Sequence, residues 1–238
     1  MAKLASLKAQ TRLLDRRAAD QIRTHILDGI LPAGQRLLET KLSADLEVSR
    51  GTVRSALAQL ANEGLVKQVA FTSWEGSGAS VSDAWEIYTL RGALEGLGAR
   101  LAAGNIDEAA GKALRAIAED LGKAVRRGRY QEAIGFDFDL HTAIVEMARH
   151  QRLADQQRYI LQQVRFHMVQ SGFLPEDYDA LMAEHTRLIE TVLAGDADNA
   201  EKLARSHNDA EVKLLAKRLK EGDGATPAAS PKRVRARA

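Results

Sequence analysis

The sequence predicts a mainly α-helical protein that consists of an N-terminal winged helix-turn-helix followed by an antiparallel all-α bundle of six helices. Hydrophobic residues make up 45% of the 238 residues and aromatic residues only 5%, which favours a helical protein. Residues 42–66 have the pattern of helix, tight turn and helix. From residue 83 onward, apolar residues recur with helical periodicity. We therefore expect an extension over 1–14, a DNA-binding domain over 15–82, a helical domain over 83–220 and a disordered basic tail over 221–238.

The first predicted elements are three helices. The first is amphipathic, carries Ala18, Ile22 and Ile26 on one face, and ends at Gly29. The next two lie in LSADLEVSRGTVRSALAQLANEGLV, where apolar residues mark one face of each helix. Ser49 is a good N-cap, so the third helix begins there.

The start of this third helix is the predicted DNA contact. It carries Arg50, Thr52 and Arg54 off its apolar face. In a helix-turn-helix such residues face the major groove, where arginine binds guanine edges and phosphates. We therefore predict that Ser49, Arg50, Thr52 and Arg54 contact DNA; the alternative is an ordinary helical hairpin with surface arginines.

A two-stranded wing is expected after the third helix. Residues 65–70 and 79–82 have the pattern of short strands, joined by a Gly/Ser-rich tip over 71–78. Gly76 in this tip is a further candidate DNA contact.

Composition restricts the kinds of site and compartment. The chain has no cysteine, which excludes disulfides and cysteine-based zinc sites. No apolar run reaches the length of a membrane span, and the N-terminus lacks a signal peptide, so we expect a cytoplasmic protein without a membrane partner. The net charge is only +2, but the tail is basic: it is either a nonspecific phosphate-binding arm or a solubilising segment.

The second domain is expected to contain six helices with short connections, which favour antiparallel neighbours. Pro175 suits the first turn of the fifth helix. The expected ranges are 83–103, 107–127, 130–148, 152–171, 175–194 and 197–219.

Polar residues on the apolar faces of these helices predict a metal site. Asp137 and His141 are four residues apart on one apolar face, and His185 and His207 lie among apolar residues of the last two helices. Imidazole and carboxylate suit a divalent ion, zinc foremost, with nickel or manganese as alternatives. The competing interpretation is that these are hydrogen-bonded core histidines.

Two arginines are candidates for binding an effector in the same domain. Arg91 lies four residues before Glu95, so it either faces the pocket or forms an intrahelical pair with a structural Glu95. Arg165 is the second candidate.

Two groups of segments resemble a known family. ILDGILPAGQRLLE and LSADLEVSRGTVRSALAQLANEGLV resemble the GntR superfamily of bacterial transcription regulators. FDFDLHTAIVEMARHQRL and EHTRLIETVLAGDADNAEKLARSH resemble the FCD effector domain of its FadR branch, and six helices rather than seven point to the VanR-like subgroup. The resemblance implies a metal held by Asp137, His141, His185 and His207, with a small carboxylate completing its coordination and meeting Arg91.

The resulting functional hypothesis is a ligand-responsive transcriptional regulator, a repressor of a catabolic or transport operon. It would bind a near-palindromic double-stranded operator as a homodimer, and the effector would release it from DNA or retain it there. One alternative is a metal-dependent hydrolase-like enzyme that uses the Asp/His₃ site; another is an architectural DNA-binding protein. We predict no enzyme, because no unassigned carboxylate is expected near the ligands and helical phase predicts that Glu184 and Glu201 point elsewhere.

Overall fold

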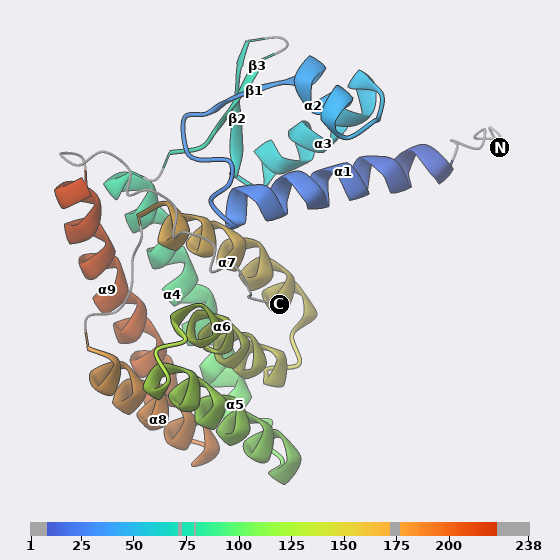
Figure 1. Cartoon of the computed structure of the whole chain (residues 1–238). Helices are drawn as coiled ribbons and strands as arrows, with labels where there is room; N and C mark the ends of the chain where they lie inside the picture. Colours follow the sequence, from blue (N-terminus) through green and yellow to red (C-terminus); the bar gives the residue numbers. More distant parts are fainter. Residues whose placement is uncertain (1–8, 71–72, 79, 172–176, 223–238) are drawn as a thin grey trace, which may run out of the picture. The chain divides into compact units, whose positions relative to one another are not determined.

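The computed structural model describes residues 9–70, 73–78, 80–171 and 177–222 (Figure 1). The chain divides into two compact units, one up to residue 79 and one from residue 80. Helices dominate both, which confirms the predicted fold class. Among the described helices, none is both long and apolar enough to cross a membrane.

The N-terminal unit combines three helices with a small sheet. Its elements are α1 (Ala9–Leu27), β1 (Arg36–Leu38), α2 (Glu39–Asp45), α3 (Arg50–Asn62), β2 (Val66–Ala70) and β3 (Ser73–Gly76). Helix α1 starts at Ala9, so residues 9–14 belong to a helix rather than to an extension. The sheet is antiparallel with the order β1-β3-β2.

The core of this unit lies between α1 and α3. Ile22 and Ile26 of α1 are buried, as are Val53, Leu57 and Leu60 of α3. These are the residues that the helical periodicity placed on the apolar faces, so local pattern and packing agree. The predicted N-cap is also confirmed, because the Ser49 hydroxyl accepts a hydrogen bond of 3.0 Å from the Thr52 backbone N–H.

The wing differs from the prediction. Its second strand is β3, Ser73–Gly76, whereas Val81 already belongs to the next helix, so a strand over 79–82 is wrong; residue 79 itself lies outside the described residues. Trp74 explains the difference, because its side chain is buried and its backbone faces Leu37 of β1 and Gln68 of β2. A Ser/Gly-rich stretch is therefore the central strand of the sheet.

The C-terminal unit consists of helices joined by short connections. They are α4 (Val81–Ala103), α5 (Glu108–Arg126), α6 (Tyr130–Met147), α7 (Gln151–Ser171), α8 (Tyr178–Leu193) and α9 (Ala197–Gly222). The predicted helices are present. Helix α8 begins later than predicted, after an Asp177 N-cap that accepts from the Ala180 N–H at 2.9 Å. Pro175 lies outside the described residues.

Helix α4 lies among the other helices of this unit and contacts α6, α7, α8 and α9 (Figure 1). Small residues allow the close approach. A Cβ at Gly98 would lie 2.6 Å from Val145 Cγ2 of α6, and one at Gly92 would lie 3.3 Å from Asn208 Cβ of α9. In this interior Glu95 of α4 lies beside His141 of α6, and Arg91 of α4 lies beside Glu211 of α9.

Candidate metal centre and DNA interface

Three buried histidines from three helices meet inside the C-terminal unit. They are His141 of α6, His185 of α8 and His207 of α9, with exposed fractions of 2%, 1% and 5%. One ring nitrogen from each lies within 4.8 Å of the others. The sequence predicted all three as inward-facing, and the structure brings them together.

Carboxylates fix the orientation of two of these rings. His141 Nδ1 lies 3.1 Å from Glu95 Oε2, and His207 Nδ1 lies 3.1 Å from Glu184 Oε2. Donation of the Nδ1 hydrogen to a carboxylate leaves the Nε2 lone pair free, which is the arrangement that orients histidine ligands of metals. The Nε2 atoms of His141 and His185 are 3.3 Å apart, so the available nitrogens converge.

Asp137 completes this group on α6. Its Oδ1 lies 3.1 Å from His185 Nε2, and the residue is 7% exposed. Burial raises the pKa of the Asp137 carboxyl. Burial, together with the neighbouring His207 and His141, lowers the pKa of His185 well below its usual value, so His185 is a neutral imidazole. Burial opposes the charged form of His207 too, but Glu211 and Glu184 outweigh it and raise its pKa.

The residues present fit a divalent ion. His207 Nε2 is buried without a hydrogen-bond partner among the described residues, which a coordinated ion would supply. A cavity of about 30 Å³, lined in part by Glu184, His185 and His207, adjoins the group. That volume suits a single ion or water molecule. A set of three imidazoles, which bind a metal ion in their neutral form, and a carboxylate is typical of sites for zinc and similar ions.

More carboxylates surround the histidines than the sequence predicted. Glu184 does not point elsewhere, since it contacts His207, and Glu211 Oε1 lies 3.7 Å from His207 Nε2. The prediction that no unassigned carboxylate lies near the four ligands is therefore wrong. Glu211 follows His207 by four residues, the same spacing as in Asp137 and His141, which is the signal that could have identified it.

Arg91 is buried at the edge of this site. It is 1% exposed, and its guanidinium donates to Glu95 Oε1 at 2.9 Å and to Glu211 Oε2 at 2.6 Å. Burial opposes its charge, but the two carboxylates outweigh this effect and raise the pKa of Arg91. Arg91 Nη2 has no hydrogen-bond partner among the described residues. The guanidinium carbon of Arg91 lies 5.6 Å from the centroid of the Tyr88 ring. The Arg91–Glu95 pair exists, but in the interior rather than on the surface.

Arg165, the other predicted effector residue, lies elsewhere. It is exposed on α7, so it does not line the interior of the helical unit and this prediction is wrong.

The predicted DNA-contact residues of α3 have three different environments. Arg50 is exposed and makes no hydrogen bond or ion pair with any residue that the structure describes. Thr52 is only 6% exposed and its hydroxyl lies 3.1 Å from that of Ser49, so its predicted exposure at the helix start is wrong. Arg54 is half-exposed and ion-paired with Glu39.

The Arg54–Glu39 pair joins three elements of the N-terminal unit. Arg54 Nε and Nη2 donate to the two carboxylate oxygens of Glu39 at 2.9 and 2.7 Å. The Trp74 indole donates to the same carboxylate at 3.3 Å. Glu39, at the start of α2, therefore fixes the guanidinium of α3 relative to β3, a connection that single-helix reasoning did not find.

Gly76 is not at the tip of the wing as predicted. It ends β3, and its backbone exchanges hydrogen bonds with Gly34 and Gln35 at 3.0 and 3.1 Å. A Cβ there would lie 2.9 Å from the Pro32 carbonyl oxygen, so close packing explains the glycine.

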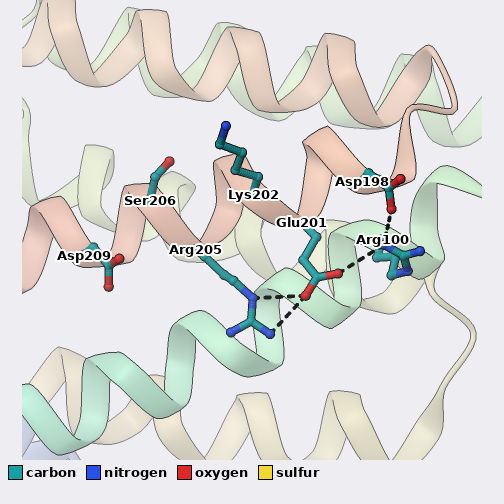
Figure 2. A pocket seen from close by; sticks show the side chains of 7 residues that line it. All are labelled: Arg100, Asp198, Glu201, Lys202, Arg205, Ser206 and Asp209. Carbon is teal, nitrogen blue, oxygen red and sulfur yellow. Dashed lines mark hydrogen bonds and ion pairs between the residues drawn. The ribbon is translucent and has the colours of Figure 1, made fainter.

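A larger groove of about 460 Å³ lies on the surface of the C-terminal unit. It is lined by Arg100 of α4 and by charged residues of α9 (Figure 2). Glu201 pairs with both Arg100 and Arg205, and Arg100 also pairs with Asp198 (Figure 2). The charges of Arg100, Asp198, Glu201 and Arg205 satisfy one another, so we assign no ligand to the groove.

Comparison with known proteins gives matches to both units. Residues 14–79 match the family described as bacterial regulatory proteins, gntR family, and residues 86–210 match the FCD domain. The chain is 24% identical over 204 residues to the HTH-type transcriptional regulator YdhC of Bacillus subtilis (strain 168), covering 85% of this chain and 91% of that one. It is 27% identical over 198 residues to the gluconate operon transcriptional repressor of Bacillus licheniformis, covering 76% of each.

Solved structures share the fold. McbR/YncC of E. coli superimposes with a TM-score of 0.69 at 18% identity, over 86% of this chain and 97% of that one. A GntR transcriptional regulator from Rhodococcus sp. RHA1 superimposes with a TM-score of 0.70 at 20% identity, over 85% and 97%. The winged helix-turn-helix and the helical unit are therefore the shared architecture.

Proposed function

Because this chain belongs to the GntR family of bacterial regulators and carries an FCD domain, it is a DNA-binding transcriptional regulator, and we propose that it represses a catabolic or transport operon. In this proposal a small carboxylate effector binds in the metal-containing pocket of the helical unit and changes the affinity for the operator. A homodimer would place two α3 helices on a near-palindromic operator. The gluconate operon repressor among its relatives supports the choice of a catabolic or transport operon.

The DNA-reading part of the proposal rests on α3. Arg50 lies in its first turn with an exposed guanidinium, which suits a bidentate contact to guanine or a phosphate. Arg54 is positioned by Glu39 and has a side chain that is 55% exposed, so it can reach a phosphate while it remains ion-paired.

The single observation that carries the metal proposal is the convergence of the three histidines. Two of their Nδ1 atoms lie 3.1 Å from carboxylates, which directs the Nε2 atoms toward one another. His141, His185, His207 and Asp137 would hold the ion. When bound, a divalent ion supplies a positive charge and open coordination positions for an anionic ligand.

Arg91 would recognise the second part of the effector. Its Nη2 is buried without a partner among the described residues, and the buried Tyr88 hydroxyl likewise has none. Unsatisfied buried donors are costly, so they point to a ligand whose oxygens complete them. Arg91 lies on α4, the helix that follows the DNA-binding unit in the chain, and effector binding there can therefore favour one DNA-binding arrangement over another.

The family points away from an enzyme, and we propose no catalytic activity. The carboxylates beside the histidines have another use in this proposal. Glu95 and Glu184 orient His141 and His207, and a glutamate that already accepts a histidine hydrogen is a positioning group.

The experiment combines metal analysis with DNA binding. An operator is selected from random duplex DNA, and its affinity is measured by fluorescence anisotropy for the zinc-loaded protein with and without a panel of small carboxylates. We expect zinc at one ion per chain, an effector-dependent change in affinity, and loss of this response in Arg91→Ala. Arg165→Ala is the matched control, because Arg165 is exposed on α7.

Three outcomes would contradict separate parts of the proposal. Failure to select any DNA sequence would contradict the operator. Absence of stoichiometric metal after zinc addition would contradict the metal site. A full carboxylate response in Arg91→Ala would contradict the assignment of Arg91.

A further inference from the structure

The position that an effector carboxylate would take between Arg91 and the histidines already contains a carboxylate. Glu211 of α9 accepts a hydrogen bond of 2.6 Å from Arg91 Nη1 through Oε2. Its other oxygen, Oε1, lies 3.7 Å from His207 Nε2, the nitrogen that has no hydrogen-bond partner among the described residues. One carboxylate therefore extends from the guanidinium to a proposed metal-binding nitrogen.

The surroundings of Glu211 restrict what else can enter. Glu211 is 7% exposed and Arg91 is 1% exposed, so both oxygens are held inside the unit. The cavity beside His185 and His207 measures about 30 Å³, and neither Arg91 nor Glu211 lines it. This volume suits one ion or water molecule rather than an organic acid.

Charge leads to the same conclusion. The carboxylates of the site are those of Glu95, Asp137, Glu184 and Glu211. Arg91 pairs with two of them, and Arg187 lines the cavity beside Glu184. When the histidines are neutral, as metal binding requires, and all four carboxylates are ionised, a divalent ion and the two arginines bring the formal charge to 0. A further anion would make the site negative, whereas an anion that replaces Glu211 leaves the charge of the site unchanged.

We propose that Glu211 is an internal carboxylate that closes the pocket when no effector is bound, and that an effector carboxylate binds by exchange with it between Arg91 and the metal. The inference rests on the metal-containing pocket of the proposed function. It adds the mechanism of regulation: the exchange releases Glu211 and its segment of α9 from Arg91 of α4. These two arrangements of α9 are the states that the effector distinguishes.

The test measures zinc affinity by competition with a chromophoric chelator, with zinc alone and with added acetate as the carboxylate probe. The variants are Glu211→Gln and Glu211→Ala. The matched control is Glu201→Gln on the same helix, where Glu201 pairs with Arg100 and Arg205 on the surface (Figure 2). Circular dichroism checks that each variant is folded.

If Glu211 is the internal carboxylate, both Glu211 variants bind zinc about 10- to 100-fold more weakly than the wild type, while Glu201→Gln does not. Acetate restores the zinc affinity of Glu211→Ala, because the shortened side chain leaves room for it, and has no effect on the wild type at the same concentration. Where Glu211→Ala does not fold, the zinc affinity of Glu211→Gln decides.

Equal zinc affinities in Glu211→Gln and Glu201→Gln would overturn the inference and leave the metal site of the proposed function intact. A zinc affinity that is weaker in Glu211→Ala and is not restored by acetate would also overturn the inference, since Glu211 would then have only a structural role. No zinc binding by the wild type would contradict the proposed function itself.

Discussion

Zinc should stabilise the helical unit by an amount that the histidine site determines. The perturbation is addition of zinc to protein stripped with a chelator. His141, His185 and His207 come from α6, α8 and α9, so an ion bound by all three links helices that are separate in the unfolded chain. Such an ion binds the folded state preferentially, and folding is stabilised in proportion to the logarithm of its free concentration.

The expected size follows from this linkage. At a free zinc concentration of about 1,000 times the Kd, the unfolding free energy rises by about 4 kcal/mol. For a unit that covers residues 80–222, this corresponds to a Tm increase of about 12 °C, taking about 3 °C per kcal/mol. The N-terminal unit contains none of these ligands, so its unfolding transition should not move.

Differential scanning calorimetry measures both transitions with and without zinc. His185→Ala combined with His207→Ala should abolish the zinc-dependent increase. His25→Ala is the control, because His25 is an exposed histidine of α1 whose ring bonds only to the Gln21 carbonyl among the described contacts. An unchanged Tm in the wild type, or an equal increase in the double variant, would refute the proposed ligand set.

Three further predictions concern single residues. Arg50→Ala should weaken operator binding by about 1–3 kcal/mol, a 5- to 150-fold loss by fluorescence anisotropy, and an unchanged affinity would remove Arg50 from the interface. Glu39→Gln should lower the Tm of the N-terminal unit at neutral pH, because it removes the ion pair with Arg54. Hydrogen bonds from Arg54 lower the pKa of Glu39, so the stabilisation by this ion pair is present above the unfolded-state pKa and is lost as the pH falls through the lower folded-state pKa. Urea unfolding of the wild type and the variant at several pH values tests this dependence. Gly98→Val should destabilise the helical unit by about 1–3 kcal/mol or more, because a Cβ at this position would lie 2.6 Å from Val145 Cγ2. The control is Gly135→Ala, since a Cβ at Gly135 would have nothing within 4 Å. Equal urea midpoints for the two variants would contradict the close packing of α4 against α6.

Much of the fold could be predicted because it depends on local pattern. Helical periodicity and N-caps such as Ser49 are properties of neighbouring residues, and these signals found the helices of both units, although α1 begins earlier and α8 later than predicted. The wing could not be predicted equally well. Strand β3 is defined by its pairing with β1 and β2 and by the burial of Trp74, which are tertiary interactions that a Ser/Gly-rich stretch does not reveal.

The residues of the site show the same difference between local pattern and tertiary contact. His141, His185 and His207 could be found because each lies on the apolar face of its own helix. Glu184 could not, because it is on α8 but bonds to His207 of α9, and the phase of one helix says nothing about that neighbour. The prediction for Thr52 was wrong for another reason: its position at the start of α3 suggested exposure, but the residue is 6% exposed and its hydroxyl lies 3.1 Å from that of Ser49.

Two of the four arginines that the sequence singled out for binding DNA or an effector share one property in the structure. Arg54 is held by Glu39, and Arg91 is held by Glu95 and Glu211. Breaking a buried pair by removing one partner costs about 3–5 kcal/mol, because the other charge is left uncompensated. A ligand that engages Arg91 is therefore favoured only if it supplies an equivalent carboxylate, or if it uses the unpaired Nη2 while the existing pairs remain. For Arg91 exchange with Glu211 supplies that equivalent carboxylate, and the same ligand can also accept from Nη2. For Arg54 the half-exposed side chain permits a phosphate contact without any exchange.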